Sequence, residues 1–354
     1  MRPAAAVAAA AAAPVPSEPL LRCCYCGRHR RSSALGLTSP TPPRYHYCQI
    51  VVAQLRGDAW ATARRPLELH SPLRAPPGGR QALVVRTFSA TTEASIVLTQ
   101  KGNRRESAAV PVDLACAVIR LPLQPRAESD GAELLSIADA DLVASSGLGI
   151  DEASVCDAWL SAARGGDQAA AAASAADADG ACARHLVVPL SFNMAHGPFD
   201  AATVGASVLT SAPALIDPVV IDQAAFRAVV RAYARAGKRH EFHPGAVVFT
   251  RSSGGGCGTV THVENRTSMP MRHTIHYTEA AGMQLSRQPT PVIADTVPPG
   301  HGMVAVVAAP VAAGAWRLAS QTRMALHSGG FWDVAAHEPP VPADDELHVV
   351  ERLD

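Results

Sequence analysis

The sequence predicts a mainly β protein with minor α content, in which two β-sandwich-like halves are joined by helical segments. Short apolar segments separated by Gly, Pro and Asn occur over residues 83–121 and again over 246–326, a pattern typical of antiparallel strands. Between residues 151 and 237, apolar residues recur at helical spacing instead, which places helices between the two strand-rich regions.

Shifts in composition along the chain predict five segments. The ends and an internal alanine-rich stretch hold too few large apolar residues to form a core by themselves. The predicted segments are a disordered Ala/Pro/Arg-rich tail over 1–44, an N-terminal β-rich domain over 45–150, a helical connector over 151–237 with a low-complexity insert at 167–181, a C-terminal β-sandwich over 238–336 and an acidic tail over 337–354.

Composition and charge restrict the partners of the protein. The chain has 354 residues, of which 48% are hydrophobic, enough for two ordinary cores. Lys and Arg number 31 and Asp and Glu also number 31, so no net charge attracts nucleic acid, and nucleic acid is not an expected partner. No apolar run approaches the roughly 18 to 20 residues that cross a bilayer, so we expect no membrane span.

Cysteine usage indicates a reducing compartment. The eight cysteines are sparse and irregularly spaced, and no secretory leader precedes them, so we expect an intracellular protein and favour the cytoplasm. A mitochondrial location stays open, because arginines outnumber acidic residues in the first 31 positions.

The N-terminal half holds three clear strand candidates. Residues 83–88, 94–100 and 110–121 are rich in Val, Ile and Leu, and they are bounded by the Pro-Pro-Gly-Gly run at 76–79 and a Lys-Gly-Asn turn at 101–103. These signals predict an antiparallel β region. A further strand is expected at 185–192.

A first helix is predicted over residues 151–164. Its apolar residues fall on one face at helical spacing, and two glycines follow as a stop. The residues of this face are Val155, Cys156, Trp159, Leu160 and Ala163.

A second helix carries its own start and stop signals. Asp217 is the expected N-cap and Pro218 the first helical residue, while Gly237 ends the helix. Apolar residues at i, i+3, i+4 and i+7 form the buried stripe. They are Phe226, Val229, Val230 and Tyr233.

The C-terminal half contains seven short strand candidates, whose spacing favours a β-sandwich. In residues 271–278 the alternation sends Met271, His273, Ile275 and Tyr277 to one face, as a half-buried strand requires. The candidate strands are 246–250, 259–264, 271–278, 291–297, 303–309, 315–319 and 322–326.

The block from 242 to 326 resembles the small β-sandwich modules that accompany calpain-type cysteine peptidases. It has an opening Phe-x-x-Gly strand, an Asn-Thr-type turn, a long cross-sheet strand and a Pro-rich approach to a Val-rich strand. The matching positions are Phe242, Gly245, Asn265, Thr267 and Val297 to Val307. The resemblance covers about a quarter of the chain and implies a sandwich module of this type.

The same resemblance implies a candidate peptidase site. Cys156 would be the nucleophile and His196 the base, with Asn193 beside it, because an imidazole must generate the thiolate and a third group must orient it. The chain departs from the peptidase pattern: the Gly-rich approach, the Cys-Trp pair and the Asn-Pro-Trp signature are missing. The contrasting interpretation makes Cys156 and Trp159 core residues of a helix.

A candidate zinc site lies near the N-terminus. Cys23 and Cys26 have C-x-x-C spacing with Gly27 directly after them, and His46 and Cys48 are two residues apart. A regular zinc ribbon or finger would offer a second C-x-x-C or H-x3–5-H pair, which is missing. The contrasting interpretation is a set of cysteines in a basic tail.

These observations favour a non-catalytic protein-binding or scaffolding module of a larger assembly, with protein partners and no expected cofactor. Two alternatives stay open. One is a calpain-like cysteine peptidase with a divergent active site, and the other is a zinc-bearing subunit of a nucleic-acid-associated assembly.

Overall fold

A computed structural model gives the fold of the chain. The chain divides into two compact units, Met1–Trp60 and Ala61–Asp354. In the first unit, the structure describes a single antiparallel pair, β1 (Leu20–Arg22) and β2 (His29–Arg31). The described residues of the second unit are 61–88, 91–100, 112–121, 134–135, 137, 140–147, 153–161, 182–195, 201–252, 258–287, 291–311, 316–327 and 346–353.

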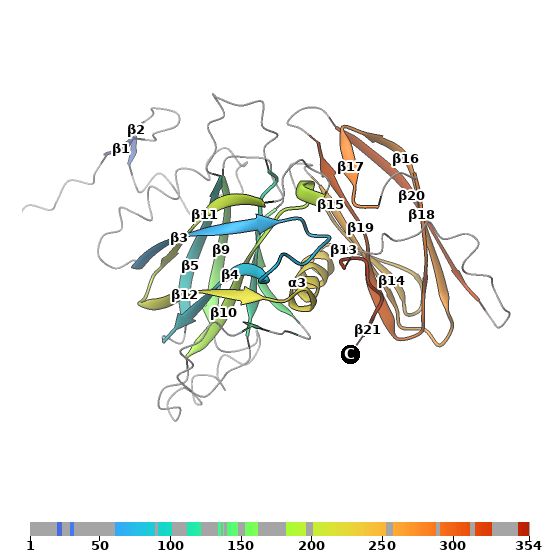
Figure 1. Ribbon diagram of the computed structural model, residues 1–354, viewed down its shortest axis with the longest axis horizontal. Coiled ribbons are helices and arrows are strands. Elements are labelled where there is room, and N and C mark those ends of the chain that lie inside the picture. The colour runs from blue at the N-terminus through green and yellow to red at the C-terminus, as the bar shows by residue number, and fades with distance from the viewer. Residues whose placement is uncertain are drawn as a thin grey trace, which may run out of the picture. The chain divides into compact units, whose positions relative to one another are not determined.

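Two facing sheets form the first part of the larger unit, and we call them the N-terminal sheet pair (Figure 1). One sheet has the order β7-β12-β4-β10-β6-β8 and the other has the order β3-β11-β5-β9. The first consists of β7 (Leu134–Leu135), β12 (Ala214–Ile221), β4 (Arg80–Thr87), β10 (Ala183–Leu190), β6 (Ala115–Arg120) and β8 (Asp141–Ser145). The second consists of β3 (Ala61–His70), β11 (Ala201–Thr210), β5 (Thr91–Gln100) and β9 (Ala153–Ser161).

The long strands of this pair alternate between its two sheets along the chain. The chain passes from β3 to β4, β5 and β6 and later from β9 to β10, β11 and β12, and it changes sheet at each step. Neighbouring strands run antiparallel, apart from the parallel contact of β12 with β7. This alternation is typical of jelly-roll sandwiches, in which it buries the apolar faces of both sheets in one core.

A second pair of facing sheets, the C-terminal sheet pair, follows after a helix (Figure 1). One sheet has the order β13-β14-β15-β19-β17, with β21 beside β19, and the other has the order β18-β16-β20. The first consists of β13 (Lys238–His243), β14 (Ala246–Ser252), β15 (Thr259–Asn265), β19 (His301–Pro310), β17 (Met283–Leu285) and β21 (Glu351–Arg352). The second consists of β18 (Val292–Val297), β16 (Met271–Ala281) and β20 (Arg317–Leu326).

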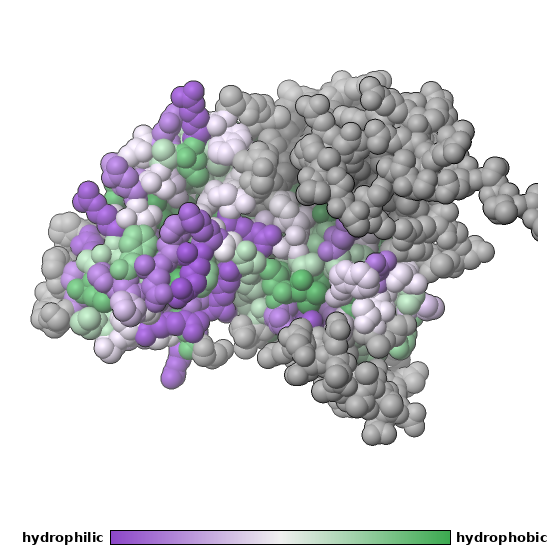
Figure 2. Space-filling model, turned by 180° about the vertical axis from the view of Figure 1, so that it is seen from behind, coloured by the Kyte–Doolittle hydropathy of each residue, from purple (hydrophilic) through white to green (hydrophobic). Residues whose placement is uncertain are grey.

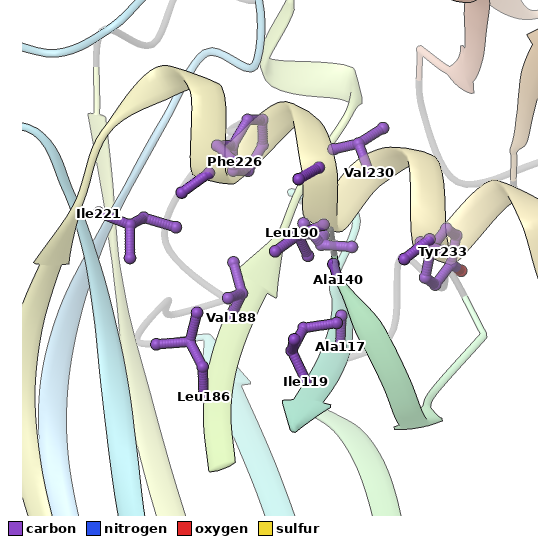
Figure 3. Packing of buried hydrophobic residues seen from close by; sticks show 14 of the residues in the cluster. Ala117, Ile119, Ala140, Leu186, Val188, Leu190, Ile221, Phe226, Val230 and Tyr233 are labelled. Carbon is purple, nitrogen blue, oxygen red and sulfur yellow. The ribbon is translucent and has the colours of Figure 1, made fainter. Parts of the chain in front are cut away.

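The helix α3 (Gln223–Arg235) shares one apolar cluster with residues of both sheet pairs. Phe226, Val230 and Tyr233 of α3 share this cluster with residues of β6 and β10 on one side and with Val260 and Val304 of the C-terminal pair on the other. Figure 3 shows α3 lying across the strands of the N-terminal pair. The labelled strand residues near it are Leu186, Val188 and Leu190 of β10 and Ala117 and Ile119 of β6.

The apolar clusters stack in a regular succession through the unit. One cluster fills the space between the two sheets of the N-terminal pair, and another fills the space between the two sheets of the C-terminal pair. The cluster around α3 lies between them. Burial of these faces is the main stabilising contribution to such a fold. Among the described residues, no helix has the length and apolar character needed to cross a membrane.

Most of the predicted strands are confirmed. The segments predicted at 83–88, 94–100, 110–121 and 185–192 overlap β4, β5, β6 and β10. In β16 the predicted alternation holds, since Met271, His273, Ile275 and Tyr277 are all buried. The two segments predicted at 315–319 and 322–326 form one strand, β20.

The helix predicted over 151–164 is wrong. Residues Ala153–Ser161 form strand β9, which pairs with β5 along its whole length. Its buried side chains alternate, with Cys156 and Leu160 inward and Trp159 outward and 63% exposed. The described part of the predicted helical connector over 151–237 therefore contains β9, β10, β11 and β12 besides α3.

The predicted helix before Gly237 is confirmed in its stripe and its end, but its start is wrong. Asp217 and Pro218 lie within β12, and the N-cap is Asp222, whose side chain accepts a hydrogen bond from the Ala225 N–H at 2.6 Å. The last residue of the helix is Arg235, and Ala236 is its C-cap. Asp217 pairs instead with Arg86 on the neighbouring strand β4, and this pairing suits a strand.

Candidate binding groove

A groove lies between the two sheets of the C-terminal pair, at the side where β13 and β20 are the outer strands. Its volume is about 720 Å³, within the range of ligand-binding clefts. The lining residues come from the end of α3, from β13 and β14, and from β20. They are Ala236, Gly237, Lys238, His240, Phe242, Val248, Thr250, Arg251, Ser252, Ser320 and Thr322.

Strand pairing positions the groove side chains. Lys238 lies opposite Thr250 and His240 lies opposite Val248 in the antiparallel β13–β14 pair. Side chains of alternate residues point to the same face, so Lys238 and His240 share the face of Val248, which belongs to the apolar cluster between the sheets. From β20, Ser320 and Thr322 line the groove on the opposite side.

The turn between β13 and β14 requires a glycine. Gly245 has φ +84°, and its N–H donates a hydrogen bond to the Glu241 carboxylate at 2.9 Å. Arg239 donates a second hydrogen bond to Glu241 at 2.8 Å. Glu241 therefore fixes the turn and neutralises Arg239, and neither residue lines the groove.

Strand β13 is exposed along its entire length. All six of its side chains are exposed, and no described strand pairs with its outer edge. A register shift between Glu241 and His243 marks a bulge at Phe242, which is 42% exposed. Bulges and charged residues are the usual protection of an edge strand against self-association.

Arg251 holds the end of α3 against the groove. Its guanidinium lies 4.0 Å from the centre of the Tyr233 ring, and it donates to the Tyr233 carbonyl at 3.1 Å and to Ser145 Oγ at 2.7 Å. These partners carry no formal charge, so none of them cancels the positive charge of Arg251. Figure 2, which shows the molecule from behind, has many hydrophilic residues over the half that holds the C-terminal strands.

The residues predicted for a peptidase site lie in different surroundings. Cys156 is 3% exposed within the apolar cluster of the N-terminal pair, where its thiol meets that of Cys116. The hydrogen bond with Cys156, together with burial, raises the pKa of the Cys116 thiol. Asn193 is buried in a short 3-10 turn, and its side-chain oxygen accepts from the Asp113 N–H at 3.1 Å. His196 lies outside the described residues.

The predicted zinc ligands Cys23, Cys26, His46 and Cys48 also lie outside the described residues. Within the part of the chain that the structure describes, no group of three or more His, Cys, Asp or Glu side chains is placed to hold a metal ion. Two buried histidines of the C-terminal pair have different surroundings. His273 is buried between the sheets, and His262 contacts Glu264 at 3.2 Å.

The groove could not be predicted from the sequence, because its residues lie up to 86 positions apart and only the packing of the two sheets brings them together. A signal was present in residues 238–243, of which five are Lys, Arg, His or Glu, directly before an apolar strand. Such a charged strand beside an apolar one is typical of a sheet edge.

We found no protein-family model that matches this chain, and no curated protein matches it either. The resemblance to calpain-associated sandwich modules therefore stays a prediction. Its Asn-Thr turn is formed: Asn265 Oδ1 accepts hydrogen bonds from the Thr267 N–H at 3.1 Å and from Thr267 Oγ1 at 2.7 Å.

Proposed function

We propose that this chain is a non-catalytic protein-binding module of a larger assembly, and that it binds its partner through the edge of β13 and the adjacent groove. The observation that carries the proposal is the exposure of all six side chains of β13 on a strand at the edge of its sheet. Such an edge offers unpaired backbone N–H and C=O groups to an extended segment of another protein.

The surroundings of β13 support this role. The groove runs along the strand, so side chains of a bound segment can enter it while the backbones pair. Phe242 gives the site an exposed aromatic residue, and aromatic residues are common anchors of protein interfaces. We also infer that the two sheet pairs are the two predicted β-sandwich halves, and that α3 packs against both of them.

A peptidase function lacks comparable support. A cysteine nucleophile must reach its substrate, and Cys156 is buried among aliphatic side chains on the inner face of β9. The zinc-bearing alternative depends on residues outside the described part of the chain, so it stays a prediction.

Site-specific photo-crosslinking tests the proposal. A photoreactive phenylalanine analogue would replace Phe242 in the full chain, and in a matched variant it would replace Trp159, which is exposed on the outer face of β9. The proposal expects a defined protein to crosslink at position 242 and not at position 159. Excess unlabelled wild-type chain should compete for that crosslink.

Two results would contradict the proposal. One is equal crosslinking at both positions, which would indicate unspecific contact. The other is a crosslink at position 242 that survives competition with excess wild-type chain. Circular dichroism of both variants verifies that each is folded before the comparison.

A further inference from the structure

The groove beside β13 has a one-sided charge. Among its lining residues, Lys238 and His240 are the basic residues whose side chains share the inner face, and none of the lining residues is a carboxylate. Arg251 also lines the groove, but its guanidinium lies against the Tyr233 ring of α3. The nearest acidic side chain on β13, Glu241, lies on the opposite face and is held by Arg239 and the Gly245 N–H. Cationic groups without acidic neighbours favour an anionic ligand.

Hydroxyl groups add hydrogen-bonding capacity to this charge. Thr250 and Ser252 of β14 face Ser320 and Thr322 of β20 across the groove. Each hydroxyl can donate one hydrogen bond, and carboxylate oxygens accept several. Both walls of the groove therefore offer donors to the same ligand groups.

The strand geometry fixes the spacing of those groups. An extended segment paired with β13 points every second side chain toward the groove, and cross-strand neighbours lie about 5 Å apart. Lys238 and His240 are two residues apart on that face. Acidic side chains at alternate positions of the segment would therefore meet Lys238 and His240 in turn.

We propose that the groove binds an extended segment of a partner protein, which adds to β13 as a further strand and directs alternating carboxylates at Lys238 and His240. This inference rests on the proposed binding function and names the chemistry of the partner. The basic residues that discourage β13 from pairing with a second copy of itself then select a partner of opposite charge.

The test uses fluorescein-labelled peptides and the full chain. The main probe is a six-residue peptide of alternating Glu and Val, the length of β13. Three further probes are a Lys-Val repeat, a Glu-Pro repeat and a single-stranded oligonucleotide. Fluorescence anisotropy at low and high salt should show binding of the Glu-Val peptide alone, weakened by salt.

Each comparison probe isolates one component of the proposal. The Lys-Val repeat reverses the charge and keeps the strand propensity. The Glu-Pro repeat keeps the charge but disfavours strand pairing, because each proline lacks an N–H donor and fixes φ near −65°. Equal or tighter binding of the Glu-Pro repeat or the oligonucleotide would overturn the proposal, since charge alone would then explain it.

Charge reversal on the chain provides the matched control. Lys238→Glu should weaken binding of the Glu-Val peptide about tenfold, because an attraction becomes a repulsion. Arg323→Glu makes the same change of charge on β20, at an exposed residue that does not line the groove, and should leave binding unchanged. An equal effect of both variants would also overturn the proposal.

The outcomes separate this inference from the function on which it rests. A competed crosslink at position 242 without binding of the Glu-Val peptide rejects the acidic strand and keeps the binding module. Failure of the position-specific crosslink rejects the binding module itself. Binding of the Glu-Val peptide that is lost in Lys238→Glu supports the acidic strand.

Discussion

Among the described acidic residues, Asp113 is the most buried, and its carboxylate has a clear structural task. Its Oδ1 accepts hydrogen bonds from Ser191 Oγ at 2.8 Å, from the Phe192 N–H at 2.8 Å and from the Asn193 N–H at 2.9 Å. Burial raises its pKa to about 6, although these hydrogen bonds act in the opposite direction. It thus organises the turn that follows β10.

We predict that Asp113→Asn is tolerated, whereas Asp113→Ala costs about 3 kcal/mol. The asparagine oxygen can accept the same hydrogen bonds, while alanine leaves three donors without their acceptor. Because the folded pKa is raised, wild-type stability should fall as pH rises from about 4 to about 6, and the Asn variant should lack that component. Urea unfolding at several pH values measures both effects. A stability difference between wild type and Asn that does not change over this range would contradict the prediction.

Glu264 is a buried carboxylate with the opposite pH behaviour. Burial alone would raise its pKa, but His262, Arg235 and Arg266 overcome that effect and lower it to about 2. The Arg266 Nε donates to its Oε2 at 2.8 Å. Burial lowers the pKa of His262, which leaves the imidazole neutral. The carboxylate therefore links the end of α3 to β15 as an anion.

We predict that Glu264→Gln destabilises the protein by about 2 to 3 kcal/mol at neutral pH. The folded pKa is depressed, so the contribution is present above about pH 4.5 and is lost as pH falls toward about 2. The difference between wild type and variant in denaturant unfolding should shrink accordingly. Glu279→Gln is the matched control, because its pair with Arg317 is exposed and 3.6 Å long, and it should change stability little.

At the scale of elements, β9 explains why one predicted helix failed. A helix and a strand can both bring apolar residues to one face. The helix prediction over 151–164 counted the large residue Trp159 as part of the buried face. In the structure Trp159 is exposed, while the small residues Ser154 and Ala158 point inward with Cys156. Alternation was thus present in the sequence, but residue size concealed it.

The second helix shows what local signals can and cannot fix. Its apolar stripe was predictable because packing against two sheet pairs demands it. Its start was not, because Asp217-Pro218 and Asp222 both resemble caps, and the choice between them depends on the pairing of β12 with β4. The groove could not be predicted either, because it forms only where β20 of one sheet packs opposite β13 and β14 of the other.

Gly237, at the end of α3, allows helix and strand to approach closely. A Cβ at this position would meet the Thr250 carbonyl oxygen and lie 2.7 Å from Arg251 Cα, and backbone atoms cannot move aside cheaply. We predict that Gly237→Ala costs about 2 to 3 kcal/mol in urea unfolding. Gly78→Ala is the control: its φ of +88° costs about 1 kcal/mol or less, and nothing lies within 4 Å of the added carbon. Equal costs would contradict the close approach.

At the scale of the larger unit, α3 makes the two sheet pairs mutually dependent. Its apolar residues share one cluster with both pairs, and Arg227 and Arg231 also bind Glu351 of β21, Arg227 at 2.6 Å. Separation of either sheet pair from α3 would expose part of this apolar cluster to water. The two pairs should therefore unfold together, even though each has a cluster of its own.

Two tryptophans can test this coupling. Trp159 reports on the N-terminal pair and Trp316 on the C-terminal pair, once Trp60 and Trp332 are replaced by Phe and Trp159 or Trp316 is kept alone. We predict coincident urea transitions for the two single-tryptophan chains.

Val260→Ala, which removes two methyl groups from the cluster around α3, should cost about 1 to 2 kcal/mol and separate the two transitions. Ala substitution of Val263, which faces the other side of β15, should cost a similar amount without separating them. Transitions that already differ in the unsubstituted background would show that α3 does not couple the pairs.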